Sequence, residues 1–303
     1  MRVLIAGWFS FDDMGATAGD MIARDIVRQW LKEVNISADV ADSPKFPYEG
    51  GINWRIADPT NYTDLLFVCG PFGNGWPVTE LLSHFSNCRL IGVNLSLLQS
   101  LDIWNPFSLL IERDSSRNNH PDITLYASPP VIPVAGIILS HKQKEYGNKS
   151  LHDTANAAIE RLLNKVQVAK VPIDTSLLDN SGGLRTSGEV ESLIAKMDLV
   201  ITTRLHGTAL AIKNGIPVIP IDPIAGGAKI SLQAKALNWP LLFNADSLDE
   251  NELLEAFNYC LTPNARIKAM ECTEVAVKKI EDLKEIFLMQ LLSLSEKKYA
   301  YGN

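Results

Sequence analysis

One stretch in the second half of the chain most constrains the fold, because it predicts a strand, a turn, a helix and a second strand in close succession. Residues 199–201 are apolar, residues 207–212 are small and suit a helix, Asn214-Gly215 is typical of a helix end, and residues 218–221 are apolar again. The turn before the helix then lies at the carboxyl end of a parallel strand, where α/β proteins bind ligands.

Arg204 and His206 stand in this turn. A guanidinium can hold a carboxylate or a phosphate with two hydrogen bonds, and an imidazole can exchange protons near neutral pH. Free backbone N–H groups at a helix start also favour an anion. Either residue alone is more often a surface or structural group, but their pairing at the end of a buried strand favours a functional anion site.

Strand-like and helix-like segments alternate along the whole chain, which predicts an α/β fold with mostly parallel sheets. With 303 residues, of which 46% are hydrophobic and 21% charged, the chain can bury two cores. Proline interrupts the pattern at Ser128-Pro129-Pro130. We therefore expect two Rossmann-like domains, residues 1–128 and 129–303, the second ending in a helical tail.

Several elements are predicted with definite bounds. The first half should hold strands at 3–6, 65–69 and 90–93, a helix at 17–34 and a helix opened by Pro77; the second half should hold a strand within 131–139, a helix at 151–166 and a strand at 168–173. Capping boxes at Thr186–Glu189 and Ser247–Glu250 should each open a helix, the second running to about Leu261. Residues 264–294 should form one long helix or a broken pair.

Charge and cysteine content limit the classes of function. A net charge of -7 argues against broad nucleic-acid binding, which needs a basic face. Cys69, Cys88, Cys260 and Cys272 form no C-x-x-C pair, so we expect reduced, buried thiols, no metal site and a cytoplasmic protein. The chain shows no signal peptide and no run of transmembrane length, although a peripheral contact with the inner face of a membrane stays open.

The loops of the first half offer candidate ligand contacts. The glycines between Gly7 and Gly19 do not match G-x-G-x-x-G, so a dinucleotide fingerprint is not supported. Asp20 either contacts a ligand or stabilises the positive end of the helix that follows. Trp8 and Trp76 follow strands, where their rings either stack on a sugar or pack the loops.

A wider pattern resembles the signature of the polysaccharide pyruvyl transferase family. It comprises Asp198-Leu-Val-Ile-Thr-Thr-Arg204-Leu-His206-Gly207, then Gly215-Ile-Pro-Val-Ile-Pro-Ile-Asp222 and Lys229-Ile230. Gly19-Asp20, Asp64 to Gly70 and Glu112-Arg113-Asp114 are similar to family features in the same order. The resemblance covers most of the chain. It departs from the family at Pro71-Phe72, where further glycines are usual, and in the first loop at Asp12-Asp13-Met14.

The resemblance implies a fold like that of glycosyltransferases, of the B type, with a cleft between two Rossmann-like domains. It also implies transfer of pyruvate from phosphoenolpyruvate to a saccharide, which forms a ketal and releases phosphate. Phosphoenolpyruvate would be a co-substrate, and no cofactor is expected. The saccharide acceptor, free or lipid-linked, and the oligomeric state are not indicated.

Candidate site residues follow from the motif and the resemblance together. The acceptor side is expected in the first domain and the donor side in the second. The candidates are His206 and Asp222 for catalysis, with His206 as general acid/base and Asp222 orienting His206 or an acceptor hydroxyl; Arg204, Gly207, Thr208, Arg113 and Lys229 for the donor; and Asp20, Trp8 and Trp76 for the acceptor.

Two other functions remain open at this point. The first is a sugar-nucleotide-dependent glycosyltransferase of the same architecture, which would hold a diphosphate at the same helix start. The second is a catalytically silent saccharide-binding protein that keeps the fold, since a fold does not dictate a function.

Overall fold

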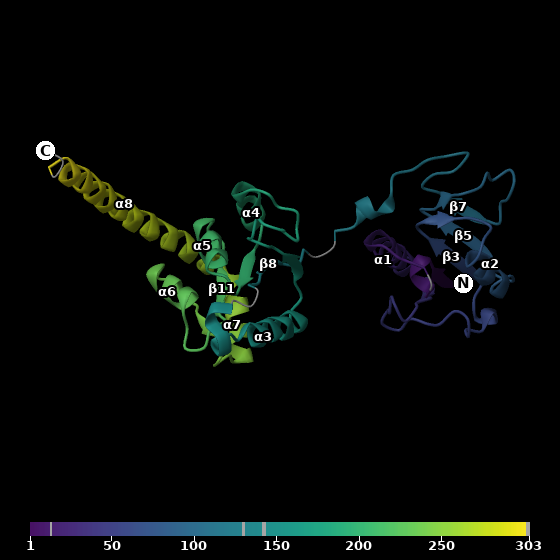
Figure 1. The fold of residues 1–303 in the computed structure, drawn as a ribbon. Helices are drawn as coiled ribbons and strands as arrows, with labels where there is room; N and C mark the ends of the chain where they lie inside the picture. Colours follow the sequence, from purple (N-terminus) through teal and green to yellow (C-terminus); the bar gives the residue numbers. More distant parts are fainter. Residues whose placement is uncertain (13, 129–130, 141–143, 301–303) are drawn as a thin grey trace. The chain divides into compact units, whose positions relative to one another are not determined.

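A computed structural model describes residues 1–12, 14–128, 131–140 and 144–300 (Figure 1). The chain divides into two compact units, Met1–Pro130 and Val131–Asn303, which we call unit 1 and unit 2. Pro129 and Pro130, at the predicted boundary, lie outside the described residues, as does Asp13 of the first loop.

Unit 1 contains a five-stranded parallel sheet in the order β2-β1-β3-β5-β7. Its strands are β1 (Arg2–Ala6), β2 (Ser37–Val40), β3 (Asp64–Val68), β5 (Arg89–Val93) and β7 (Leu109–Ile111). Alternate residues of the strands point to opposite faces, so each strand feeds two cores. One face packs against α1 (Ala18–Glu33) and the other against α2 (Val78–His84).

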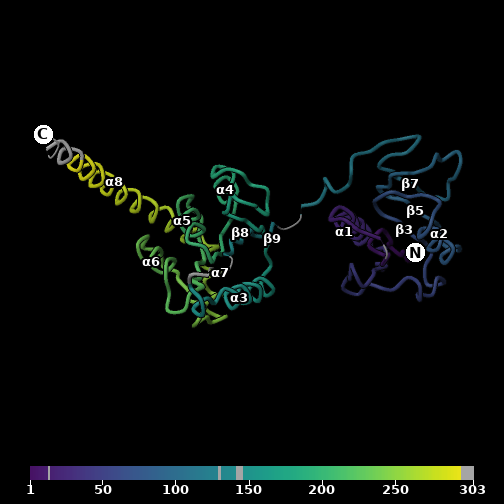
Figure 2. Tube along the Cα trace, viewed as in Figure 1, coloured from purple at the N-terminus to yellow at the C-terminus, as the bar shows by residue number. Residues whose placement is uncertain are grey.

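Unit 2 repeats this plan with the order β12-β11-β10-β8-β9, again all parallel. Its strands are β8 (Val134–Ile138), β9 (Ala169–Pro172), β10 (Leu199–Thr202), β11 (Val218–Asp222) and β12 (Phe243–Asn244). Leu199 and Ile201 of β10 pack against α3 (His152–Lys165) and α7 (Glu250–Cys260). Figure 2 shows α3 and α7 side by side. Val200 faces α4 (Ser187–Ile194), α5 (Leu205–Lys213) and the start of α8 (Pro263–Ala300).

Smaller elements complete the two units. They are α6 (Lys229–Ala236), the two-stranded parallel pair β4 (Pro71–Phe72) and β6 (Ser96–Leu97), and the 3₁₀ turns η1 (Trp8–Ser10), η2 (Pro59–Asn61), η3 (Ile123–Tyr126) and η4 (Lys144–Lys149).

The strand order confirms the predicted α/β fold with two Rossmann-like parallel sheets. If the five strands of each unit are numbered along the chain, they lie across the sheet in the order 2-1-3-4-5. The winding direction therefore reverses between the first and third strands. This reversal lies between β1 and β3 in unit 1 and between β8 and β10 in unit 2. Helices on either side diverge at such a point and leave room for a ligand beyond the carboxyl ends of the strands.

Most predicted elements agree with the structure to within a few residues, and one predicted cap is wrong. The Thr186–Glu189 capping box is present, and the tail is a single helix, α8. The box expected at Ser247–Glu250 is absent, because Asp249 caps α7 by accepting hydrogen bonds from the backbone N–H groups of Asn251 and Glu252. Glu250 instead pairs with Arg161 and Lys165 on α3, so its carboxylate is not available to a Ser247 cap.

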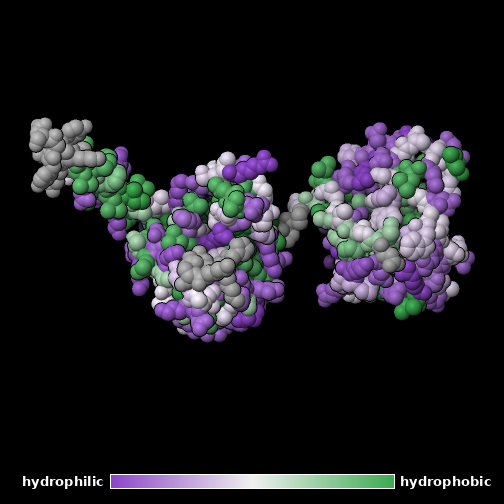
Figure 3. Space-filling model, viewed as in Figure 1, coloured by the Kyte–Doolittle hydropathy of each residue, from purple (hydrophilic) through white to green (hydrophobic). Residues whose placement is uncertain are grey.

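The outer part of α8 extends from the body of unit 2 with exposed apolar side chains (Figures 1 and 3). They include Ile280, Leu283, Phe287, Leu291 and Leu294. Among the helices formed by the described residues, none has the combination of length and apolar content needed to cross a bilayer.

The corrected cap yields a stability prediction. Asp249→Ala should lower the free energy of unfolding by about 1 kcal/mol, because two N–H groups at the start of α7 lose their acceptor. Ser247→Ala is the control and should change it by less than about 0.5 kcal/mol, as a surface substitution does. Urea unfolding followed by circular dichroism measures both, and an equal or larger loss in Ser247→Ala would contradict the assignment of the cap.

Candidate functional site

A cavity of about 450 Å³ lies at the carboxyl ends of the strands of unit 2. It opens where β8 and β10 meet, which is the reversal point of the sheet. Residues that follow β8, β9, β10 and β11, together with the first turns of α5 and α6, line it: Ser140, Tyr146, Thr175, Thr203, Arg204, Leu205, His206, Asp222, Pro223, Ile224, Ala228, Lys229 and Ile230.

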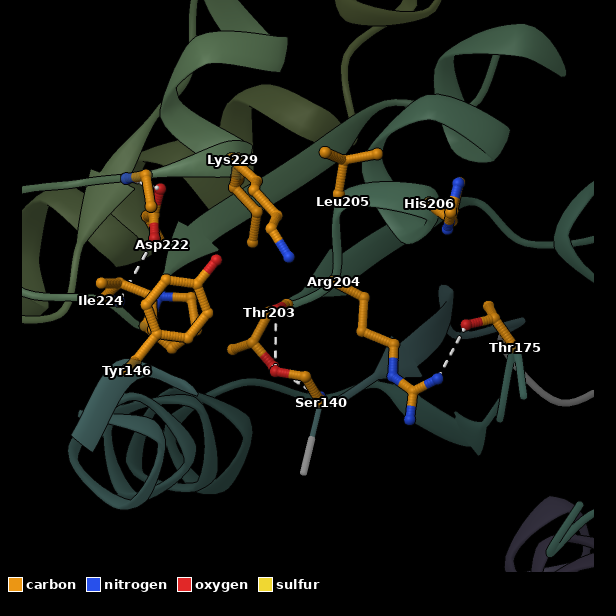
Figure 4. A pocket seen from close by; sticks show the side chains of 13 residues that line it. Ser140, Tyr146, Thr175, Thr203, Arg204, Leu205, His206, Asp222, Ile224 and Lys229 are labelled. Carbon is orange, nitrogen blue, oxygen red and sulfur yellow. Dashed lines mark hydrogen bonds between the residues drawn. The ribbon is translucent and has the colours of Figure 1, made fainter. Parts of the chain in front are cut away.

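Arg204 is the N-cap residue of α5, and its side chain is held in one orientation. Its Nε donates a hydrogen bond to the carbonyl oxygen of Leu139 at 2.8 Å, and its Nη1 donates to Oγ1 of Thr175 at 3.1 Å. Asp174 lies 3.4 Å from Nη1. Figure 4 shows the side chain running from the end of β10 toward Thr175. No described residue accepts a hydrogen bond from Nη2, so this nitrogen is left for a ligand.

The turn that presents Arg204 depends on Thr202 and Gly207. Thr202 Oγ1 donates to the carbonyl oxygen of Ile138 at 2.8 Å and accepts the backbone N–H of Arg204 at 2.9 Å. A Cβ atom at Gly207 would lie 2.2 Å from Thr202 Oγ1 and 3.1 Å from a methyl group of Ile138. Only glycine therefore lets the first turn of α5 approach β10 this closely.

His206 and Lys229 occupy the first turns of α5 and α6, and both side chains are exposed. His206 makes no hydrogen bond with the described residues, so its imidazole is available for proton transfer. The Nζ of Lys229 lies 5.5 Å from the ring centroid of Tyr146. Figure 4 shows this ammonium group pointing into the pocket, at some remove from His206.

The start of α5 adds positive potential to the cavity. Its N-cap residue makes no side-chain hydrogen bond to the helix, and α5 begins among the residues that line the cavity. The start of α6 also lines the cavity, but the carboxylate of Asp222 caps it by accepting the N–H groups of Ala228 and Ser231. The aligned peptide dipoles of a helix leave a partial positive charge at its start. With Arg204 and Lys229, the cavity therefore suits a small ligand with more than one negative charge.

Asp222 lines the cavity, and its hydrogen bonds are made to the turn between β11 and α6. Its side chain is buried and accepts hydrogen bonds from the backbone N–H groups of Ile224, Ala228 and Ser231, and from the hydroxyl of Ser231. None of its hydrogen bonds within the described part of the chain goes to His206. A buried carboxylate needs several donors, and these come from the β11–α6 turn, so Asp222 fixes the start of α6.

The other predicted donor residues lie outside the lining of the cavity. Gly207 and Thr208 are buried in the first turn of α5, where they pack rather than face the ligand space. Arg113 belongs to unit 1, where its Nη1 donates to Asp122 at 2.7 Å and its Nη2 donates to Ser96. These contacts account for Arg113 without a ligand.

The three predicted acceptor residues differ in what they offer. Asp20 is buried and forms a capping box with Thr17, in which its Oδ2 accepts the backbone N–H of Thr17 at 2.7 Å. This favours the helix-stabilising role. Trp8 packs over Gly70 and donates from Nε1 to the carbonyl oxygen of Pro71, which favours loop packing. Trp76 keeps 60% of its surface exposed, with Nε1 bonded to Glu80, so it retains a ring face for a sugar.

Sequence reasoning missed the hydroxyl groups of the cavity. Ser140 donates its backbone N–H to Oγ1 of Thr203 at 2.8 Å and its hydroxyl to the carbonyl oxygen of Thr203, which joins the ends of β8 and β10. Ser140 and Thr175 come one and two residues after predicted strands, at 131–139 and 168–173. The strand-end position was therefore a signal that could have identified them.

The cysteines are free, and three of them are buried. Cys69, Cys260 and Cys272 are buried as predicted, whereas Cys88 is only partly buried. Burial raises the pKa of the Cys260 thiol to about 12. Among the described residues, no group of three or more His, Cys, Asp or Glu side chains is arranged to hold a metal ion.

Residues 121–223 match the family model described as polysaccharide pyruvyl transferase, which confirms the resemblance seen in the sequence. The matched segment includes Arg204, His206 and Asp222. The chain is also 26% identical over 200 residues to an NAD kinase of Blochmanniella floridana; this match covers 64% of the chain and 60% of the length of that kinase. The family match supports a transferase.

Solved glycosyltransferases are similar over most of the chain but with low scores. One is the spinosyn rhamnosyltransferase SpnG complexed with thymidine diphosphate, at 13% identity, 92% coverage of this chain, 96% coverage of that chain and a TM-score of 0.33. Another is MurG of Acinetobacter baumannii, at 11% identity, 93% and 98% coverage and a TM-score of 0.35. These scores are too low to support an argument, so the fold rests on the strand order above.

The ion pair of Arg113 and Asp122 predicts a pH dependence of stability. Burial raises the pKa of Asp122, but hydrogen bonds from Thr124, Arg113 and Asn94 outweigh it and lower the pKa to about 2. Because this lies below the ordinary value of about 3.9, the pair stabilises the folded state above about pH 4, and this stabilisation is lost as the pH falls toward 2. Asp122→Asn should therefore destabilise the protein near neutral pH and progressively less below about pH 4.

Urea unfolding across this pH range measures the difference between wild type and Asp122→Asn. Asp102→Asn is the control, because Asp102 pairs with Arg117 in an exposed ion pair that contributes little. A gap that stays constant down to pH 2 would contradict the lowered pKa.

Proposed function

We propose, from the match of residues 121–223 to the polysaccharide pyruvyl transferase family, that this transferase moves pyruvate from phosphoenolpyruvate to a saccharide. The product is a ketal, and phosphate is released. The observation that carries the proposal is the cavity of unit 2, which combines two cations and the uncapped start of α5 around an accessible imidazole.

Phosphoenolpyruvate has the charges that this cavity suits. Its carboxylate and its phosphate can bind the free Nη2 of Arg204, the ammonium of Lys229 and the N–H groups at the start of α5. The cavity volume of about 450 Å³ falls in the range of small-molecule sites. Thr175 and Asp174 keep the Arg204 guanidinium in place before the donor arrives.

His206 acts in the proposal as the general acid and base. It donates a proton to the methylene carbon of phosphoenolpyruvate, and a sugar hydroxyl oxygen then attacks the central carbon, which has become cationic. The proton of that hydroxyl returns to His206. A second hydroxyl oxygen of the sugar displaces the phosphate, which leaves with the second hydroxyl proton, so that atoms and charges balance.

The remaining parts of the proposal concern the acceptor and the compartment. The acceptor is a saccharide, free or lipid-linked, which we assign to unit 1, where Trp76 has an exposed ring that can stack on a sugar. We place the reaction in the cytoplasm, because the four free cysteines suit a reducing compartment.

A sugar-nucleotide-dependent glycosyltransferase fits this cavity less well. Such an enzyme needs a carboxylate for the ribose hydroxyls. Asp222 lines the cavity, but its carboxylate already accepts four hydrogen bonds from the β11–α6 turn. An assay separates the two reactions: candidate saccharides with phosphoenolpyruvate should release inorganic phosphate, whereas a sugar nucleotide should release no nucleoside diphosphate.

Donor binding gives the first functional prediction. Wild-type protein should bind phosphoenolpyruvate in a calorimetric titration, and Arg204→Ala should weaken the affinity by about 10- to 100-fold, the loss expected for charge-assisted hydrogen bonds. Lys213→Ala is the matched control, because it removes a cation from the other end of α5, where Lys213 pairs with Glu191. A wild-type protein without affinity for phosphoenolpyruvate, or an equal loss in both variants, would refute the donor site.

Catalysis gives a separate prediction. His206→Gln should retain the affinity for phosphoenolpyruvate but lower the rate of phosphate release by about 100- to 10,000-fold, the usual contribution of a general acid/base. Unchanged phosphate release in this variant would exclude the proton-transfer role. A silent saccharide-binding protein would show no acceptor-dependent phosphate release in the wild type either.

A further inference from the structure

A loop after β9 is organised by one asparagine side chain. Asn180 Nδ2 donates hydrogen bonds to the carbonyl oxygens of Asp174 and Ser176. Asn180 Oδ1 accepts the backbone N–H groups of Gly182 and Leu184 at 2.9 and 3.0 Å. Four hydrogen bonds from one side chain therefore fix both ends of residues 174–184, which we call the Asn180 loop.

The Asn180 loop contacts the guanidinium of Arg204 through its first two residues. Thr175 Oγ1 accepts a hydrogen bond from Nη1 at 3.1 Å, and Asp174 Oδ1 lies 3.4 Å from the same nitrogen. Asp174 Oδ1 also accepts the backbone N–H of Ser176 at 2.9 Å, so its carboxylate cannot turn freely. The side chains of Arg204 and Asp174 are only 19% and 14% exposed, which limits competition from water.

We propose that the Asn180 loop is a positioning device for the donor: Asp174 and Thr175 hold one edge of the Arg204 guanidinium and leave Nη2 free for a ligand. The inference rests on the proposed donor site. Arginine loses rotamer freedom when it grips a ligand, and a side chain that is already held loses less. Asp174 therefore increases the affinity for the donor by holding Arg204, without contacting the donor itself.

The sign of one substitution separates positioning from simple electrostatics. A carboxylate beside an anion site repels the ligand, so on charge alone Asp174→Asn should tighten the binding of phosphoenolpyruvate. If Asp174 positions Arg204, the same change should weaken it. Asparagine keeps an oxygen that can accept the N–H of Ser176, so this variant preserves the loop.

The test is a calorimetric titration with phosphoenolpyruvate on single variants of the loop, on double variants with Arg204→Ala and on a control variant. Asp174→Asn and Thr175→Val should each weaken binding about tenfold, and Asn180→Ala should weaken it at least as much, as expected for residues in direct contact. In an Arg204→Ala background, Asp174→Asn and Thr175→Val should cause no further loss, because the guanidinium that they position is gone. Glu191→Gln, which removes a carboxylate from the surface pair with Lys213, is the control and should bind like the wild type.

Unchanged or tighter binding in Asp174→Asn would overturn the proposal, and so would additive losses in the Arg204→Ala background.

A readout without donor keeps the test independent of the proposed function. Phenylglyoxal modifies accessible guanidinium groups, and mass spectrometry can follow Arg204. Its modification should be several-fold faster in Asp174→Asn and Asn180→Ala than in the wild type. If wild-type protein binds no phosphoenolpyruvate but the modification rates differ in this way, the donor assignment fails and the positioning stands; equal rates would overturn the positioning.

Discussion

The hydroxyl of Thr202 is the contact on which the cavity depends. It joins the carbonyl oxygen of Ile138 at the end of β8 to the backbone N–H of Arg204 after β10. Because these two strands flank the reversal of the sheet, the two hydrogen bonds of Thr202 fix the backbone of the site at the position where helices diverge. Gly207 completes the arrangement by letting α5 approach Thr202 closely. This arrangement sets the backbone positions of Arg204 and His206.

This acidic chain keeps a locally positive site because the nearby carboxylates already form hydrogen bonds or ion pairs with other groups. Asp222 is satisfied by the start of α6, and Asp174 by Arg204 and a backbone N–H. Neither carboxylate is left as an unpaired charge in the cavity, although both lie beside it. Arg204, Lys229 and the start of α5 therefore make the cavity locally positive within a protein of net charge -7.

Periodic patterns predicted the fold, whereas competition between polar groups decided the details. The apolar runs predicted most strands of both parallel sheets, and the run before Arg204 predicted its place at a helix start, because burial enforces these patterns. The roles of Asp222 and Asp249 could not be read in this way, since each depends on which N–H groups the folded backbone brings near. Arg113 pairs with Asp122, a contact that no sequence pattern indicated. The Asn180 loop has no periodicity, so no pattern pointed to it.

The two units have the same strand order but differ in what lies at the reversal point of the sheet. Between β1 and β3 of unit 1, the indole of Trp8 lies on Gly70, and the Thr17–Asp20 capping box brings a carboxylate to the start of α1. In unit 1, side chains of the unit itself thus occupy the space at the reversal point, and a carboxylate offsets the positive charge of the helix start. Unit 2 leaves both open at its own reversal point. The same topology accordingly gives one unit whose own side chains occupy the reversal point and another that keeps a cavity and an uncapped helix start there.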